Sequence, residues 1–113
     1  MVEINSVKFG EITIDKKIYY SDMIIWWDGK TEYREKTHEF KMDEFLKLLE
    51  RKPEIIVIGT GISGVLKVLE EVEQEAENKG VEIFKDTSPK AAEMFNGFVA
   101  DKKRAVAVLH STC

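Results

Sequence analysis

IIVIGTGISG, residues 55–64, is the stretch on which the rest of the chain depends. Its first four residues are apolar with no polar side chain among them, which is typical of a strand buried on both faces. The three glycines that follow have the spacing G-x-G-x-x-G, and an apolar helical pattern begins directly after them. We therefore expect a buried strand, a tight turn, and then a helix from Ile62 to Ala76 that ends at Gly80.

The glycine turn is the best candidate for a binding site, because exposed N–H groups at the start of a helix attract anions. Interpreted as a dinucleotide fingerprint, the turn also needs an acidic residue about 20 positions further on, and Asp86 lies near that place. The length of the chain argues against dinucleotide binding, because the dinucleotide-binding fold consists of two mononucleotide-binding halves and this chain has room for about one. Two alternatives to dinucleotide binding remain: the turn binds another anion or small ligand, or it has a structural role only. The candidate ligand-binding residues are Gly59, Thr60, Gly61, Ser63, Gly64 and Asp86.

Composition narrows the class of protein. The chain has 113 residues, of which 43% are hydrophobic and 34% charged, and this predicts one folded domain over residues 1–113. The net charge of −4 argues against nucleic acids and anionic membranes as partners. No apolar run approaches the roughly 20 residues of a membrane span, no signal peptide is evident, and the single cysteine suits a reducing compartment. We expect a cytoplasmic protein, and its abundant Lys and Glu favour a thermophilic source.

The segment before the central strand is predicted to be mostly β-structure. Alternating apolar residues indicate a hairpin that turns near residues 15–16. Residues 23–27 are apolar at both odd and even positions, as in a strand covered on both sides. Trp26 and Trp27 should point to opposite faces of that strand, one into the core and the other over a groove or a partner surface. A hairpin signal at residues 28–29 predicts a polar edge strand over residues 31–36.

The remaining elements alternate between helix and strand. A short helix is predicted over residues 42–51, and residues 81–84 should form a second strand parallel to the first. Ser88 is expected to cap a further helix, and residues 105–109 form a final buried strand. The predicted fold class is α/β, a β-hairpin region followed by a β-α-β-α-β unit.

A second group of candidate residues lies outside the glycine turn. His110 and Cys113 suggest a base and a nucleophile, but residues three apart on an extended strand face opposite sides, about 10 Å apart. The pair would need a bend after His110, or an imidazole from His38. These three residues also offer zinc ligands, at a spacing that fits no standard signature, so we predict no metal. Asp22 precedes a buried strand and is a candidate if its carboxylate is drawn inward; the alternative is a turn aspartate that accepts nearby N–H groups.

Several motifs follow one another along the whole chain. They are Phe9-Gly10 before Ile12-x-Ile14, Tyr20-Ser21-Asp22, Asp28-Gly29, His38, Pro53-Glu54, Ile58-Gly59-Thr60-Gly61, Asn96, and Leu109-His110-Ser111-Thr112-Cys113. In this order they resemble the small Mth-type domain family, which includes archaeal and bacterial proteins of unknown function, the animal adipogenesis-associated Mth-type domain protein and a mitochondrial complex I assembly factor. The resemblance implies a three-layer α/β fold with a mixed central sheet and the β-hairpin region packed alongside. It implies no established reaction, and eukaryotic members are described as regulatory or assembly proteins.

The sequence and this resemblance lead to two functional hypotheses. The first is a non-catalytic domain that acts by binding a protein partner, as an assembly or regulatory protein. The second is a protein or small enzyme that binds a small ligand, anion or nucleotide at the turn Gly59–Gly64. No catalytic residue set stands out, so an enzyme is the less favoured alternative. We expect no cofactor, with a dinucleotide as the weaker alternative, and neither nucleic acid nor membrane as a partner; self-association stays open.

Overall fold

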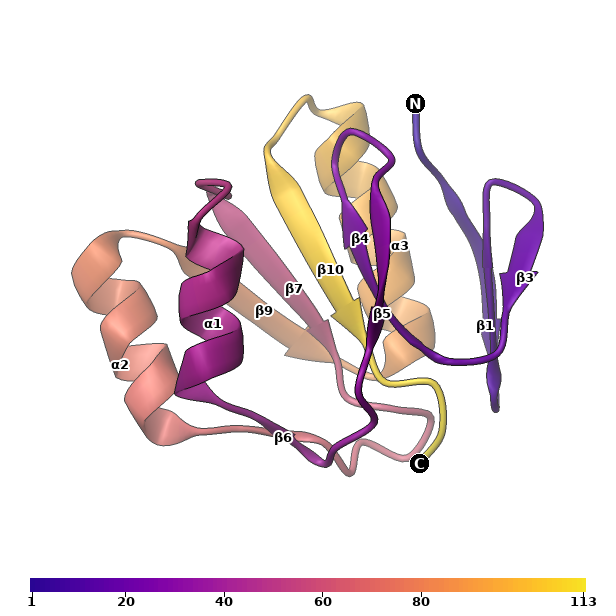
Figure 1. Ribbon diagram of the computed structural model, residues 1–113. Coiled ribbons are helices and arrows are strands. Elements are labelled where there is room, and N and C mark those ends of the chain that lie inside the picture. Colours follow the sequence, from indigo (N-terminus) through magenta and orange to yellow (C-terminus); the bar gives the residue numbers. More distant parts are fainter.

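A mixed five-stranded sheet forms the centre of the computed structural model, which describes residues 1–113 (Figure 1). The strand order is β5 (Thr31–Arg34), β4 (Asp22–Trp26), β10 (Ala105–Leu109), β7 (Ile55–Gly59) and β9 (Glu82–Asp86). Strands β10, β7 and β9 run parallel to one another, whereas β4 is antiparallel to β10 and β5 is antiparallel to β4. The predicted parallel pairing of the second strand with the central one is confirmed, and so is the polar edge strand.

Both faces of this sheet are covered. Helix α3 (Ser88–Ala100) packs on one face together with a three-stranded sheet of β1 (Ile4–Lys8), β2 (Glu11–Ile14) and β3 (Lys17–Tyr19). Helices α1 (Met42–Leu49) and α2 (Glu70–Lys79) cover the other face, on the left in Figure 1. The three-layer α/β fold with a mixed central sheet is therefore confirmed. None of the three helices has the length and apolar character needed to cross a membrane.

The central strand explains why two cores form. All five residues of β7 are buried. Because side chains alternate along a strand, Ile55 and Val57 join the core beneath α3, whereas Ile56 and Ile58 join the core beneath α1 and α2. An uninterrupted apolar run is what a strand with two covered faces requires, and the sequence prediction of this strand is confirmed.

Both predicted hairpins are present. Strands β2 and β3 meet at Asp15 and Lys16, which have positive φ angles of 49° and 69°. The turn contains no glycine, but the Asp15 carboxylate and backbone both bond to Glu3 at 2.9 Å, which holds this conformation. The second hairpin joins β4 to β5 through Gly29, with φ of 95°.

The helix predicted to start at Ile62 is wrong in its first half. Residues 60–66 form a loop, a short strand β8 (Lys67–Val68) pairs in parallel with β6 (Glu39–Phe40), and α2 begins only at Glu70. Gly61 and Gly64 have positive φ angles of 104° and 74°, which a continuous helix does not allow. The loop N–H groups bond instead to the C-terminal segment, as described below. The predicted helix end is confirmed, because Gly80 closes α2 in the left-handed conformation.

The expected capping role of Ser88 is also wrong. Thr87 occupies the N-cap position of α3, and its side chain makes no capping hydrogen bond. The hydroxyl of Ser88 faces the end of the sheet instead, where it accepts the Gly61 N–H at 2.9 Å and donates to the His110 carbonyl oxygen at 2.6 Å. Ser88 therefore joins three segments that are distant in sequence.

Candidate functional site

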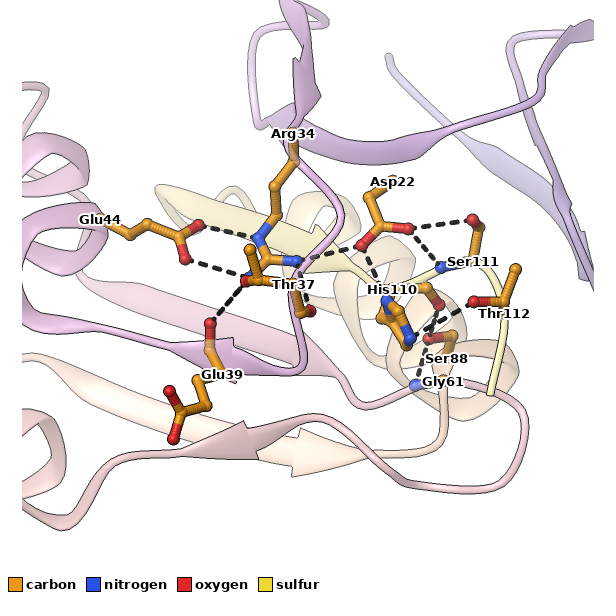
Figure 2. A network of polar contacts seen from close by, with 10 residues as sticks. All are labelled: Asp22, Arg34, Thr37, Glu39, Glu44, Gly61, Ser88, His110, Ser111 and Thr112. Atoms are coloured by element: carbon orange, nitrogen blue, oxygen red, sulfur yellow. Dashed lines mark hydrogen bonds and ion pairs between the residues drawn. The ribbon is translucent and has the colours of Figure 1, made fainter.

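The carboxylate of Asp22 is the centre of a buried polar network at the carboxyl end of β10 (Figure 2). Its Oδ2 accepts hydrogen bonds from Nη1 of Arg34 at 3.0 Å and from Nδ1 of His110 at 2.8 Å. Its Oδ1 accepts the backbone N–H and the hydroxyl of Ser111, both at 2.9 Å. Asp22 is completely buried, so its carboxylate points into the protein, as in the first of the two interpretations of this residue. A buried carboxylate is tolerated because four donors replace its water shell.

Arg34 connects this carboxylate to the opposite side of the network. Its guanidinium forms a two-point contact with the Glu44 carboxylate of α1, at 2.7 and 3.0 Å. It also donates to Thr37 and to the backbone oxygen of Glu39. The planar fork of arginine suits such a two-point contact with a carboxylate. Arg34 thereby fixes the loop that carries His38, and Figure 2 shows this guanidinium between Glu44 and Asp22.

The imidazole of His110 is held in one orientation. Because Nδ1 faces the ionised oxygen of Asp22, it carries the proton in this hydrogen bond, which leaves Nε2 as a potential acceptor or metal ligand. Nε2 lies 3.4 Å from the Thr112 hydroxyl, and the ring contacts the His38 ring edge to face, with centroids 5.2 Å apart. The fully buried His110 therefore packs its ring against that of the exposed His38.

His38, His110 and Cys113 converge. Nitrogen and sulfur atoms from these three side chains lie within 4.8 Å of one another. The extended geometry that would separate His110 from Cys113 does not apply, because strand β10 ends at Leu109 and the chain then bends. His38 approaches from the loop before β6. The thiol of Cys113 therefore has two imidazoles nearby, that of His110 because the chain bends and that of His38 from this loop.

The glycine turn is closed by the C-terminal segment. The N–H groups of Ser63 and Val65 both donate to the Cys113 carbonyl oxygen at 3.1 Å, and the Ile62 N–H donates to Thr112 at 2.7 Å. A Cβ atom at Gly61 would collide with the Cys113 backbone, so glycine is required for this close approach. Hydrogen bonds within the protein therefore use the N–H groups that an anion at this turn would need.

The other candidates of the glycine turn lie around this contact. Asp86 ends β9, where its backbone oxygen accepts the N–H and the hydroxyl of Thr60 at 2.9 and 3.1 Å. Its carboxylate accepts the adjacent Thr87 N–H at 2.7 Å. Gly59 packs against Leu109 and Ser88, whereas Ser63 and Gly64 are exposed. The structure thus unites two sets of candidates, the glycine turn and the His–Cys cluster, around one C-terminal segment.

A groove lies between α1 and strands β4 and β5, and we call it the α1 groove. Its volume is about 390 Å³, within the range of small binding sites. Its apolar floor consists of Ile24, Trp26, Phe40 and Leu48. Its charged rim includes Lys30, Glu35, Lys41, Asp43, Lys47 and Glu50. No local sequence pattern indicates this groove, because it forms only when α1 packs beside the edge of the sheet.

Arg51 lines the α1 groove together with Trp26. Its guanidinium lies 4.4 Å from the ring centre of Trp26 and 5.0 Å from that of Trp27, as in cation–π contacts. Its Nη1 atom is buried without a hydrogen-bond partner, and Nη2 donates to Asp28 at 2.7 Å. This hydrogen bond is the main reason why the pKa of Asp28 lies below its ordinary value of 3.8, and the hydrogen bond from the Lys30 N–H is the second. Of the two indoles expected on opposite faces, Trp26 lies in the core beneath α1 and α2, as predicted for one of them. Trp27 follows the end of β4 and packs against both cores, and its ring contacts that of Trp26 with centroids 5.7 Å apart.

Three residues of the buried network were not among the candidates predicted from the sequence. Arg34 looked like one charge of a polar edge strand, Ser88 looked like a helix cap, and Ser111 was only part of the terminal motif. The one sequence signal that bears on Arg34 is the alternation of side chains along the edge strand, which places Arg34 on the same face as Glu32. The partners of these residues lie far away in the sequence, so no local pattern identifies them.

Comparison with known proteins places this geometry in a family. A family model described as "Protein of unknown function (DUF498/DUF598)" matches residues 4–110. The conserved hypothetical protein PH1505 from Pyrococcus horikoshii is 29% identical, with a TM-score of 0.87 over 98% of this chain and 99% of its own. A structure named MT938 is 25% identical, with a TM-score of 0.85 over the full length of both chains. A Mth938-like domain from Bordetella pertussis, 14% identical over 96% of this chain and 85% of its own, shares the fold with a TM-score of 0.66.

Proposed function

We infer that this chain, which belongs to the DUF498/DUF598 family of proteins of unknown function, acts by binding another protein at the α1 groove. It would serve as an assembly or regulatory domain without catalysis of its own. The observation that carries the proposal is the combination of apolar lining residues with an arginine stacked on a tryptophan of the same groove. Arginine and tryptophan are enriched among the residues that dominate binding energy at protein interfaces.

The charges on the rim indicate the chemistry of the partner. Three exposed lysines and three exposed carboxylates line the groove without forming an ion pair within the chain. The lysines are Lys30, Lys41 and Lys47, and the carboxylates belong to Glu35, Asp43 and Glu50. A complementary partner therefore presents an apolar side chain to the floor and charges of both signs around it. Rim charges of this kind determine register and partner choice more than affinity.

The competing hypothesis, an anion, nucleotide or small ligand at Gly59–Gly64, has less support. An anion at this turn would have to displace the Cys113 carbonyl oxygen from the Ser63 and Val65 N–H groups. The α1 groove is already a hollow of about 390 Å³, and the side chain of Ile24 in its apolar lining is partly exposed. Protein binding at the α1 groove is therefore the preferred account.

Site-specific photo-cross-linking tests this proposal. A photoreactive amino acid would replace Lys47 at the rim of the groove, and a control would carry it in place of Lys79, an equally exposed lysine on α2. The proposal predicts that position 47 cross-links in native extract to one defined segment of a partner and that position 79 does not. Cross-linking of the same products from both positions, or of none from position 47, would overturn it.

A further inference from the structure

We propose that His38, His110 and Cys113 form a binding site for a zinc-type transition metal ion. The three donor atoms lie within 4.8 Å of one another, and they come from two parts of the chain, the loop before β6 and the C-terminal segment. Four-coordinate zinc, with bonds of about 2.0–2.1 Å to nitrogen and 2.3 Å to sulfur, places its donors roughly 3.5 Å apart. The side chains of His38 and Cys113 are both exposed, so rotations of these two side chains can close the difference without any change in the buried His110.

The contact between Asp22 and His110 supports metal binding independently of the cluster itself. A metal-bound histidine usually donates its second ring N–H to a carboxylate, which fixes the ring and makes the ligating nitrogen more basic. Asp22 Oδ2 accepts from Nδ1 of His110 at 2.8 Å, so Nε2 is the atom left to bind a metal. The structure thus contains the outer partner that a histidine ligand needs.

The backbones of the other two ligands are also fixed. The His38 carbonyl oxygen accepts the Lys67 N–H at 2.9 Å, and Arg34 bonds to the residues on either side of His38. The Cys113 carbonyl oxygen accepts the N–H groups of Ser63 and Val65. In this account, the glycine turn does not bind an anion, and its role is to position the cysteine ligand.

The donor set selects the class of ion. Two imidazoles and one thiolate suit zinc and similar borderline-soft ions, whereas magnesium and calcium prefer oxygen ligands. A bound ion deprotonates the thiol that coordinates it. Three protein ligands leave a fourth position for water or for a ligand from outside the chain. The metal site is separate from the α1 groove, so metal binding does not depend on whether the groove binds a protein.

Metal titration of the full chain tests the proposal. Chelator-treated, reduced protein would be titrated with Zn²⁺ against a chromophoric chelator, and with Co²⁺ while absorption is recorded. The proposal predicts one ion per chain and a thiolate-to-cobalt charge-transfer band. His38→Ala and Cys113→Ser should each weaken Zn²⁺ binding by at least about tenfold, and Cys113→Ser should remove the band.

Lys36→Ala, in the same exposed loop as His38, is the matched control and should bind as the wild type does. Circular dichroism and melting temperature would establish that each variant is folded. Absence of one-to-one binding in the wild type, or equal affinity in His38→Ala, Cys113→Ser and Lys36→Ala, would overturn the proposal.

Discussion

Asp22 and His110 are 88 positions apart in the sequence, and a buried hydrogen bond of 2.8 Å joins their side chains. The contact follows from strand register: β4 pairs with β10 so that Met23 lies opposite Leu109, which brings the preceding and following residues together. Through Arg34 the same carboxylate reaches Glu44 on α1. One polar network therefore connects the edge of the α1 groove to the cluster at the C-terminal segment.

Loss of the Asp22 charge should destabilise the fold. Asp22→Asn keeps the shape of the side chain but places an amide against the donors of Arg34 and His110. Breaking a buried ion pair leaves an uncompensated charge and costs about 3–5 kcal/mol; the remaining Glu44 contact places the effect near 3 kcal/mol. Chemical denaturation would measure it, with exposed Asp101→Asn as control. A loss below about 0.5 kcal/mol would show that the network adds little to stability.

The geometry of Arg34 should matter as well as its charge. Arg34→Lys retains the positive charge but replaces the planar fork with a single ammonium group. The two-point contact with Glu44 and the bonds to Thr37 and Glu39 should be lost together. Hydrogen–deuterium exchange should then increase over residues 37–44 relative to α2. Unchanged protection over residues 37–44 would contradict the assigned role of Arg34.

Two glycines should respond to substitution with opposite signs. Gly61→Val adds a Cβ atom that meets the Cys113 backbone, at a residue with φ of 104°, so we expect a large fall in melting temperature or failure to fold. Gly97→Ala adds its Cβ to open space on α3 and should stabilise the helix by about 0.5–1 kcal/mol. Thermal melts would compare the two. Equal melting temperatures for Gly61→Val and wild type would show that the loop does not pack as described.

The ion pair of Asp28 and Arg51 should make stability depend on pH. Because this pair lowers the folded-state pKa of Asp28 below 3.8, its contribution is present above 3.8 and disappears as the pH falls through the folded-state pKa. Asp28→Asn should therefore melt slightly below the wild type at pH 7, since the pair is half exposed. This difference should vanish in acid below both pKa values. A difference that stays constant across the titration would contradict an origin in this ionisation.

The parts of the fold that depend on local pattern were predictable. The apolar run of β7, the Asp28-Gly29 hairpin and the left-handed Gly80 each follow from a few adjacent residues. The start of α2 was not predictable in this way. Residues 62–66 have helical periodicity, but the carbonyl groups of residues 112–113 accept the N–H groups of residues 62, 63 and 65. Local periodicity carries no information about a contact 50 positions away.

The candidate site was predictable in its members but not in its arrangement. Asp22, His38, His110 and Cys113 stood out by residue type, yet spacing along an extended strand separated His110 from Cys113. Their meeting depends on the β4–β10 register and on the bend after Leu109, which are tertiary features. Arg34 fixes the loop before β6 and was missed, because a charged residue on an edge strand is ordinary.

The central claim, protein binding at the α1 groove, is tested most directly by a comparison of Ile24→Ala with Ile83→Ala. Both isoleucines are half-buried strand residues packed against the same core, but only Ile24 lines the groove. The two variants should lose similar stability. Calorimetric titration with the cross-linked partner segment should show affinity about tenfold lower for Ile24→Ala, corresponding to ~1.4 kcal/mol, and unchanged for Ile83→Ala. Equal affinity of both variants and the wild type would contradict the account.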